Sequence, residues 1–306
     1  MNKIGVAIFV YNRPGHTKNL FSNLLKKNKL KNFIFYIFSD FVKNPKNSSE
    51  LKKVLEVRKI VHSYKKKLKL QIFCNNQNKG LYCNIVDGVT YVLKKHSEAI
   101  ILEDDLILHK SFFLFMKKAL KKYKNSNDIF QISGYSYPIK NNRFHYFLSL
   151  TSCWGWGITR RNWNNFLKFS KNKRLLKKSF KELAQSKIAK SRFNYNNSYN
   201  YFMMLKKHLN NEVNSWGIIF YLYLFLNQKL TLFPNVSLVK NEGFDGTGNH
   251  KSKNNLFNSN FKNINIENFP KKIIEQIAHK RKIEFFFKKK LTLYAKIKNN
   301  IYEKFF

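Results

Sequence analysis

The chain has 306 residues, of which 58 are Lys or Arg and 17 are Asp or Glu, so its formal net charge is +41, and 43% of its residues are hydrophobic. That apolar fraction can build an ordinary core and excludes a disordered basic tail protein. The longest strongly apolar run, residues 218–226, is about half of the roughly 20 residues that span a bilayer. We therefore expect no transmembrane helix and, with no cleavable leader pattern, no signal peptide.

The chain has three cysteines, Cys74, Cys83 and Cys153. Their number is odd and their spacing is not that of a metal site, which favours a reducing cytosol over a disulfide framework. We therefore expect a cytoplasmic protein.

The charge of +41 is compatible with nucleic-acid binding, because Lys and Arg neutralise phosphates. The excess is nearly all Lys, scattered among many Asn, Ile and Phe residues, whereas Arg, which reads base edges best, is scarce. No helix-turn-helix, zinc or RNA-recognition pattern is present. We expect no nucleic-acid partner, and a smaller polyanion such as a nucleotide diphosphate, or an anionic membrane surface, fits the charge better.

Strands and helices are predicted to alternate along the first 124 residues. Apolar runs predict strands, and apolar residues at intervals of three and four predict helices. The predicted strands are 3–10, 33–38, 68–74 and 99–102, and the predicted helices begin near Thr17 and cover 48–66, 81–95 and 111–124. This alternation favours βαβ units in an α/β fold, with a mostly parallel central sheet flanked by helices.

Polar clusters follow three of the predicted strands: Tyr11–Arg13, Ser39–Asp40 and Glu103–Asp105. In open α/β sheets, ligands bind beyond the carboxyl ends of the strands. The three clusters therefore indicate one binding site at that edge.

The acidic triplet Glu103, Asp104 and Asp105 contains three of the chain's 17 carboxylates. Adjacent carboxylates repel one another, and Mg²⁺ or Mn²⁺ would offset that repulsion, with substrate phosphates completing its oxygen ligands. The alternative is a solvated acidic turn or a helix N-cap. The position after an apolar strand favours the metal interpretation.

The segment ILEDDLILHKSFFLFM resembles the strand, Glu-Asp-Asp motif and following segment of GT-A-fold glycosyltransferases related to N-acetylglucosaminyltransferase I. The resemblance extends to VAIFVYNRPGHTKNL, SCWGWGITRRNW and NSWGIIFYLYLFLNQKLTLFPNVSLVKNEGFDGTGNH, in that order, over residues 3–250. It implies a GT-A fold with residues 1–250 as the catalytic domain and 251–306 as a basic, helical C-terminal extension.

The resemblance implies a donor site for a UDP-sugar. Asp105 would bind Mn²⁺ or Mg²⁺, and Glu103 and Asp104 would face the donor sugar and ribose. The remaining donor-binding residues that it implies are Phe9, Tyr11, Asn12, Arg13, Asp40, Tyr82, Asn249 and His250. From the residues alone, Arg13 is equally an exposed loop cation, and Asp40 equally a strand-to-helix cap.

Trp154, Trp156 and Trp216 are candidates for stacking on a sugar or acceptor, because aromatic faces suit the apolar side of sugar rings. Core packing is the alternative for each indole ring. The glycine-rich segment 243–250 is predicted to close over the donor and exclude water, and an ordinary turn is the alternative.

The catalytic base is where the sequence departs from the family pattern. Relatives carry an Asp near the segment that here reads Val213-Asn214-Ser215-Trp216, and an inverting transfer needs a base within hydrogen-bond reach of the attacking oxygen. Glu212 and then Asp245 are the nearest candidates. Altered or lost activity is the other interpretation.

Residues 271–306 contain eleven Lys or Arg and three Glu. Ile283, Phe287, Tyr294, Ile297, Ile301 and Phe305 recur at helix-like intervals, as in a basic helix lying on an anionic membrane. Packing of this helix on the catalytic domain is the alternative. The first interpretation would place the protein at the inner membrane as a peripheral protein.

Taken together, the sequence predicts a metal-dependent glycosyltransferase that moves N-acetylglucosamine or another hexose from a UDP-sugar to a glycan or lipid-linked acceptor. By analogy with the family, the transfer would be inverting and would serve surface polysaccharide or lipopolysaccharide synthesis. Two alternatives stay open. A sugar nucleotidyltransferase would need a glycine-rich phosphate loop after the first strand, where only Gly15 stands. The other is a non-catalytic carbohydrate- or polyanion-binding protein.

Overall fold

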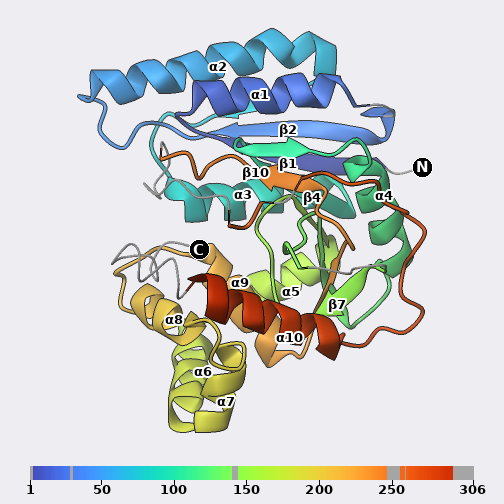
Figure 1. Cartoon of the computed structure of the whole chain (residues 1–306). Helices are drawn as coiled ribbons and strands as arrows, with labels where there is room; N and C mark the ends of the chain where they lie inside the picture. Colours follow the sequence, from blue (N-terminus) through green and yellow to red (C-terminus); the bar gives the residue numbers. More distant parts are fainter. Residues whose placement is uncertain (1–2, 28–29, 140–143, 247–255, 259, 292–306) are drawn as a thin grey trace.

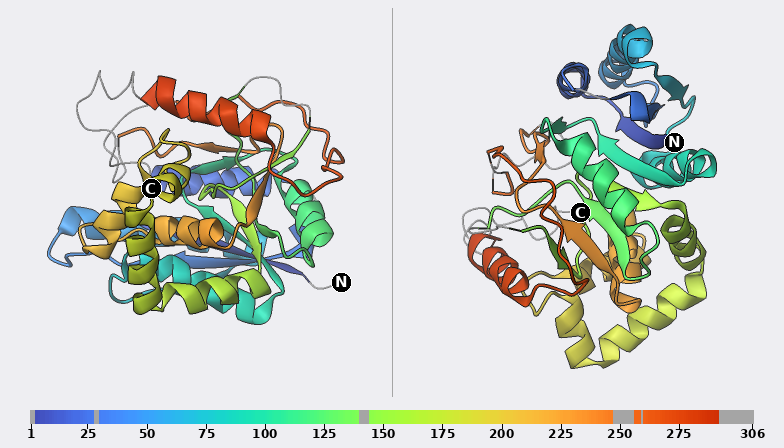
Figure 2. Two further views of the ribbon diagram at one scale, coloured as in Figure 1. Left: turned by 90° about the horizontal axis from the view of Figure 1, so that it is seen from below. Right: turned by 90° about the vertical axis from the view of Figure 1, so that its right-hand side faces the viewer.

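The computed structural model describes residues 3–27, 30–139, 144–246, 256–258 and 260–291. Its centre is an eight-stranded sheet in the order β3-β2-β1-β4-β8-β6-β9-β7, with helices on both faces (Figures 1 and 2). A second sheet of two strands, β5 (Leu106–Leu108) and β10 (Val239–Asn241), pairs antiparallel. The predicted α/β fold with a large central sheet flanked by helices is confirmed.

The first half of the sheet consists of parallel strands. It contains β1 (Ile4–Val10), β2 (Phe33–Ser39), β3 (Gln71–Cys74) and β4 (Glu98–Glu103), with β1 paired between β2 and β4. The strands are connected by the helices α1 (Pro14–Leu25), α2 (Ser48–Leu68) and α3 (Gly80–Lys95), and a short 3₁₀ turn at Leu30–Asn32 directly precedes β2. In Figure 1, α1 and α2 lie on one side of these strands and α3 on the other. Both faces are covered, which explains why β1 is buried along its whole length.

The second half of the sheet adds antiparallel pairings to this parallel core. Strand β8 (Trp156–Thr159) is antiparallel to both β4 and β6 (Ile129–Ser133). Strand β9 (Leu230–Phe233) runs parallel to β6, and β7 (Tyr146–Leu148) pairs antiparallel with β9. The sheet is therefore mixed, and its parallel order is confined mainly to the strands that alternate with helices in the sequence.

The second half contributes most of the separate helices of the described residues. Its helices are α4 (Phe112–Tyr123), α5 (Arg160–Ser170), α6 (Lys173–Gln185), α7 (Lys187–Phe193), α8 (Tyr201–Leu209), α9 (Trp216–Leu226) and α10 (Ile277–Phe286), which continues into a π-helical turn at Phe287–Leu291. Helix α9 contains the long apolar run and is buried on nearly every side, as expected for a helix that is hydrophobic all round. None of the helices formed by the described residues has the length and apolar character that crossing a bilayer requires.

Two boundaries differ from the sequence prediction for local reasons. Helix α1 begins at Pro14, because the fixed φ of proline suits the first turn, where its missing N–H is not needed. Strand β3 begins at Gln71 because α2 extends to Leu68 and is ended by Lys69 in a left-handed conformation, with φ 52°.

Candidate functional site

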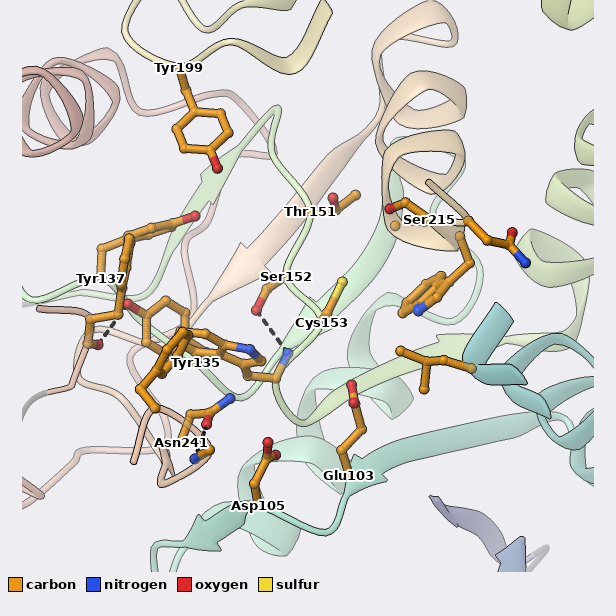
Figure 3. Close-up of a pocket in the computed structure, with 18 of the residues that line it drawn as sticks. Glu103, Asp105, Tyr135, Tyr137, Thr151, Ser152, Cys153, Tyr199, Ser215 and Asn241 are labelled. Atoms are coloured by element: carbon orange, nitrogen blue, oxygen red, sulfur yellow. Dashed lines mark hydrogen bonds between the residues drawn. The ribbon is translucent and has the colours of Figure 1, made fainter. Parts of the chain in front are cut away.

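A cavity of about 220 Å³ lies at the carboxyl ends of β1 and β4 (Figure 3). Segments from both halves of the chain form its walls. The lining residues are Arg13, Leu81, Glu103, Asp105, Tyr135, Tyr137, Thr151, Ser152, Cys153, Trp154, Tyr199, Asn214, Ser215, Trp216, Gly217, Asn241, Gly243, Phe244, Phe257 and Phe287. Charged side chains gather at one end of this cavity, and aromatic side chains form much of the rest.

The charged end is built from the strand ends that the sequence indicated. Arg13 Nη1 donates a hydrogen bond to Asp105 Oδ2 over 2.8 Å, and both side chains are largely buried. The backbone N–H of Tyr11 donates to Asp104 Oδ2 over 3.3 Å, which ties the end of β1 to the end of β4. The Glu103 carboxylate points into the cavity (Figure 3).

Gly243, which follows β10, covers the Arg13–Asp105 ion pair. A Cβ atom at this position would lie 2.2 Å from Asp105 Oδ2 and 3.0 Å from Arg13 Nη1. The backbone N–H of Glu242 donates to the Asp105 carbonyl over 2.8 Å and fixes the approach. The close contact therefore requires glycine at 243.

Burial and mutual repulsion perturb the acids at this end. Burial, followed by the charges of Asp105 and Asp104, raises the pKa of Glu103 to about 8. Burial and the charge of Asp105 raise the pKa of Asp104 to about 7. Burial alone would lower the pKa of Arg13, but the neighbouring carboxylates, led by Asp105, raise it overall. A second cation beside these acids would therefore favour their charged forms.

Among the described residues, no group of three or more His, Cys, Asp or Glu side chains is placed to hold a metal ion. Magnesium sites completed by substrate phosphates commonly use only one or two protein carboxylates. Glu103 and Asp105 both line the cavity, and their oxygens are hard donors in a crowded negative environment. The residues present therefore fit a Mg²⁺ or Mn²⁺ ion that a bound diphosphate helps to ligate.

Among the described residues that line the cavity, those of the aromatic end carry no charge. Tyr135 packs edge-on against Trp154 with ring centroids 4.7 Å apart, and Phe287 lies 5.4 Å from both Tyr137 and Tyr199. Thr151 Oγ1 is buried at the cavity wall and has no hydrogen-bond partner in the described part of the chain. Flat apolar faces of this kind suit an uncharged ligand such as a sugar ring.

The first-strand residues predicted to bind the donor lie in different surroundings. Tyr11 Oη and Asn12 Nδ2 both donate to Glu50 Oε1, over 2.8 and 3.2 Å. Phe9 is buried in the core, where its ring stacks on Phe38 at 5.3 Å. Of this group, Arg13 alone is among the residues that line the cavity.

Asp40 organises the loop that precedes α3. Its Oδ1 accepts from the backbone N–H of Lys79 and from Asn75 Nδ2, both over 3.0 Å, and its Oδ2 accepts from the N–H of Gly80 over 3.0 Å. The cap that the sequence suggested is therefore present, but on α3 rather than on the helix that follows β2. Tyr82 stacks on His208, with ring centroids 6.0 Å apart. Neither Asp40 nor Tyr82 is a lining residue.

The three candidate tryptophans divide between cavity and core. Trp154 and Trp216 line the cavity. Trp156 is fully buried and stacks on Trp216 with centroids 5.4 Å apart. Trp156 therefore packs in the core against Trp216, so the core-packing alternative holds for Trp156.

The two candidate bases lie outside the cavity lining. Glu212 is exposed in the turn after α8, and its Oε1 accepts from Asn210 Nδ2 over 3.0 Å. Asp245 Oδ2 lies 3.0 Å from His16 Nε2. Asn214 and Ser215, where the family resemblance led us to expect a base, do line the cavity. Asn249 and His250 lie outside the described residues.

Sequence reasoning missed the tyrosines and phenylalanines of the aromatic end, namely Tyr135, Tyr137, Tyr199, Phe257 and Phe287. The chain contains 16 Tyr and 30 Phe, so no single aromatic residue stands out. Position along the chain was the one available indication: Tyr135 and Tyr137 follow β6, and the end of β6 lies at the same edge of the sheet as Glu103.

Comparison with known proteins gives only distant likenesses. No family model matches the chain, and neither does any curated protein. Among solved structures, S. aureus TarS in complex with UDP-GlcNAc is similar with a TM-score of 0.39 and 15% identity, covering 54% of this chain and 46% of that one. The mannosyltransferase PcManGT from Pyrobaculum calidifontis, in complex with GDP-Man and Mn²⁺, gives a TM-score of 0.37 and 10% identity, covering 54% and 46%.

The glycosyltransferase GlyE of Streptococcus pneumoniae TIGR4 gives a TM-score of 0.37 and 11% identity over 76% of this chain and 45% of that one. The matched part spans less than half of each of these three chains. Likenesses with TM-scores below 0.5 do not by themselves assign an activity to this chain.

Proposed function

We propose that the protein is a metal-dependent glycosyltransferase of the GT-A fold that moves a hexose from a UDP-sugar to a glycan or lipid-linked hydroxyl. The observation that carries the proposal is the cavity itself. It joins an end bearing Arg13, Glu103 and Asp105 to an end walled by aromatic rings. A nucleotide diphosphate suits the first end and sugar rings suit the second.

The chain's own residues suit a diphosphate at the charged end. Arg13 carries a permanent positive charge and would bind phosphate oxygens. Asp105 and Glu103 would hold a Mn²⁺ or Mg²⁺ ion, which when bound supplies neutralisation of the charge on the departing diphosphate. Gly243 keeps its backbone against the Arg13–Asp105 pair, so protein covers one side of this end of the cavity.

The acceptor would enter from the aromatic end. Trp154 and Trp216 would stack on sugar faces. Glu212 and Asp245 are still the candidates for an inverting transfer, and either would need its loop to move toward the cavity before it could reach an acceptor.

In this proposal residues 1–250 form the transferase domain, and 251–306 are an extension that contributes Phe287 to the cavity wall. A cytoplasmic location, peripheral to the inner membrane, would bring the cavity to acceptors of surface polysaccharide or lipopolysaccharide synthesis. The donor sugar would be N-acetylglucosamine or another hexose.

The test is release of UDP from a panel of UDP-hexoses, measured with and without Mn²⁺ and with neutral glycosides as acceptors. Metal-dependent UDP release that rises with an acceptor supports the proposal. Exchange of pyrophosphate into the sugar nucleotide would instead identify a nucleotidyltransferase.

A second candidate is a non-catalytic binding protein for sugar nucleotides or glycans. It is favoured by one observation: in the described part of the chain, Glu103 and Asp105 are the carboxylates that line the cavity, and Asn214 and Ser215 occupy the expected position of the base. Tight binding of UDP-sugars in calorimetry, without turnover over hours, would support this candidate.

A further inference from the structure

Helix α10 has two faces of different character. Ile283 and Phe286 are buried, and Phe287 follows them into the core, where it packs on Tyr137 and Tyr199. For Ile283 and Phe287, packing on the domain is therefore what the structure shows. Tyr294, Ile297, Ile301 and Phe305 lie outside the described residues.

The opposite face of α10 displays apolar side chains among cations. Ile277 is 52% exposed and Phe285 is 62% exposed. Arg281, Lys282, Lys288 and Lys289 are exposed beside them. The positions 277, 281 and 285 recur every four residues, so these side chains form one stripe along α10. In the π-helical turn that follows, Lys289 Nζ lies 5.4 Å from the centroid of the Phe285 ring.

Helix α10 lies at the outside of the molecule in both views of Figure 2, and hydrogen bonds near both of its ends attach it to the domain. The backbone N–H of Gln276 donates to the carbonyl of Phe147 on the edge strand β7 over 3.0 Å. Glu275 accepts from the N–H of Ser149 over 2.7 Å and forms an ion pair with Lys280 at 2.9 Å. At the other end, Asn196 Nδ2 donates to Glu284 over 2.7 Å. The outer face is therefore presented as a preformed surface.

We propose that the outer face of α10 and of the π-helical turn after it, formed by Ile277, Arg281, Lys282, Phe285, Lys288 and Lys289, lies on the surface of an anionic lipid bilayer. Phe285 and Ile277 insert between lipid headgroups, and the four cations contact acidic headgroups around them. This arrangement combines burial of apolar area with electrostatic attraction, the two contributions that hold an interfacial helix on a membrane.

An anionic bilayer fits this face better than a nucleic acid. Duplex nucleic acids are contacted mainly through their phosphate charges, so an exposed Phe and Ile on the contact face would gain little burial there. The sequence that follows α10 repeats the pattern, since residues 292–306 contain Lys296, Lys298 and Lys304 among seven large apolar residues.

The placement has a consequence for the cavity. Phe287, at the end of the same helix, lines the aromatic end, so a bilayer against α10 would lie close behind that wall. An acceptor carried on a lipid would then be delivered near the cavity. Membrane binding of this kind requires no transferase activity, so it can be tested, and can fail, independently of the proposed function.

The experiment is cosedimentation of the full chain with vesicles of phosphatidylcholine alone or with about a third phosphatidylglycerol. We expect binding to the acidic vesicles, weakening as salt is raised. Ile277→Ser with Phe285→Ser should reduce binding at least tenfold, and Arg281→Glu with Lys282→Glu should reduce it further. All four side chains are exposed, so the fold should be unaffected.

The matched controls lie on α2, which is far from α10 in the sequence. Leu55 is 45% exposed, and Lys52 and Lys53 are exposed beside it. Leu55→Ser and Lys52→Glu with Lys53→Glu change the same chemistry elsewhere and should leave binding within twofold. Equal losses from both helices would mean that overall charge alone attracts the protein, and would overturn the proposal.

A direct measurement of insertion uses Phe285→Trp with vesicles of brominated phosphatidylcholine and phosphatidylglycerol. Bromine should quench the fluorescence added by that tryptophan beyond the signal of the unmodified protein. Absence of extra quenching would overturn the proposal. So would binding of a single-stranded RNA oligonucleotide more tightly than acidic vesicles, or a dimer in solution whose formation Phe285→Ser abolishes.

Discussion

The two ends of the cavity differ in how the chain builds them. The charged end comes from residues that directly follow two neighbouring parallel strands, with Arg13 after β1 and Glu103 to Asp105 at the end of β4. The aromatic end is assembled from Tyr135, Trp154, Tyr199, Phe257 and Phe287, which are spread over more than 150 residues.

The difference shows which site residues can be recognised from their neighbours in the sequence. Three adjacent acids after an apolar strand are rare in a chain with 17 carboxylates, so position and composition both mark them. Because the chain has 46 Tyr and Phe, a single aromatic residue cannot be recognised as a site residue until the fold brings several together. The following changes test whether the two ends have separate roles.

Asp105→Asn should have the largest effect. It removes a carboxylate ligand for the cation and leaves Arg13 with a weaker partner, so metal-dependent UDP release should fall by roughly two orders of magnitude or more. The measurement is UDP release at saturating Mn²⁺, with circular dichroism to check the fold. Asp87→Asn, at a 59% exposed site on α3, is the control and should retain full activity. Unchanged turnover in Asp105→Asn would count against the whole assignment.

Gly243→Ala should disturb the charged end, because Gly243 covers the Arg13–Asp105 ion pair. The added methyl group would lie 2.2 Å from Asp105 Oδ2, so the ion pair or the backbone must shift, at a cost of about 1–3 kcal/mol. We expect weaker UDP binding in calorimetry and a lower melting temperature. Gly15→Ala is the matched control, since no atom lies within 4 Å of its added Cβ. Equal behaviour of the two variants would show that Gly243 does not constrain the pair.

The charged end should also make stability depend on pH. Folding raises the pKa of Glu103 to about 8 and that of Asp104 to about 7, so the folded state binds more protons than the unfolded state between about pH 4.5 and 8. The free energy of unfolding contributed by these acids therefore falls as pH rises through that window.

Glu103→Gln should remove much of this decline, making the variant more stable than the unmodified protein by about 2 kcal/mol at pH 8, on a scale of roughly 1.4 kcal/mol per pKa unit. The advantage should shrink towards pH 5. Chemical denaturation of both proteins at each pH measures the difference, which cancels the effect of the large net charge. Glu56→Gln, exposed on α2, serves as control. An advantage that grows towards acid pH would contradict the assignment of these pKa shifts.

Thr151→Val should have the smallest effect and should be stabilising, unlike Gly243→Ala. It replaces a buried hydroxyl that has no partner among the described residues with a methyl group of similar size, so the melting temperature should rise slightly, for a gain of about 0.5–1 kcal/mol. Ser133→Ala is the comparison, because Ser133 Oγ donates to the Tyr135 carbonyl over 2.9 Å and its loss should destabilise. Destabilisation by Thr151→Val would show that the hydroxyl is already satisfied. UDP binding should be unchanged in Thr151→Val if the two ends act separately.

Much of the first half was predictable from sequence. The strands near 3–10, 33–38 and 99–102 and the helices between them are found within a few residues. Parallel βα units combine a buried apolar strand, a short polar turn and an amphipathic helix, and each of these leaves a local pattern. The ends of the strands could therefore be placed, and with them Arg13 and the acidic triplet.

The second half was not predictable in the same way. The pairing of β8 between β4 and β6 joins segments far apart in the chain, and β7 and β10 are only three residues long. Strands this short carry too few residues for an alternating pattern to show. Asp40 illustrates the same limit, since its partners Lys79 and Gly80 lie 39 and 40 residues away.

The sequence by itself determined the α/β class and the chemistry of the charged end, because apolar periodicity and a run of neighbouring acids are properties of adjacent residues. Only the tertiary structure decided which aromatic rings face the cavity, which tryptophan supports another from the core, and which face of α10 is exposed. Those outcomes depend on contacts between segments distant in the chain, and burial on one side of an element is settled by what packs against it.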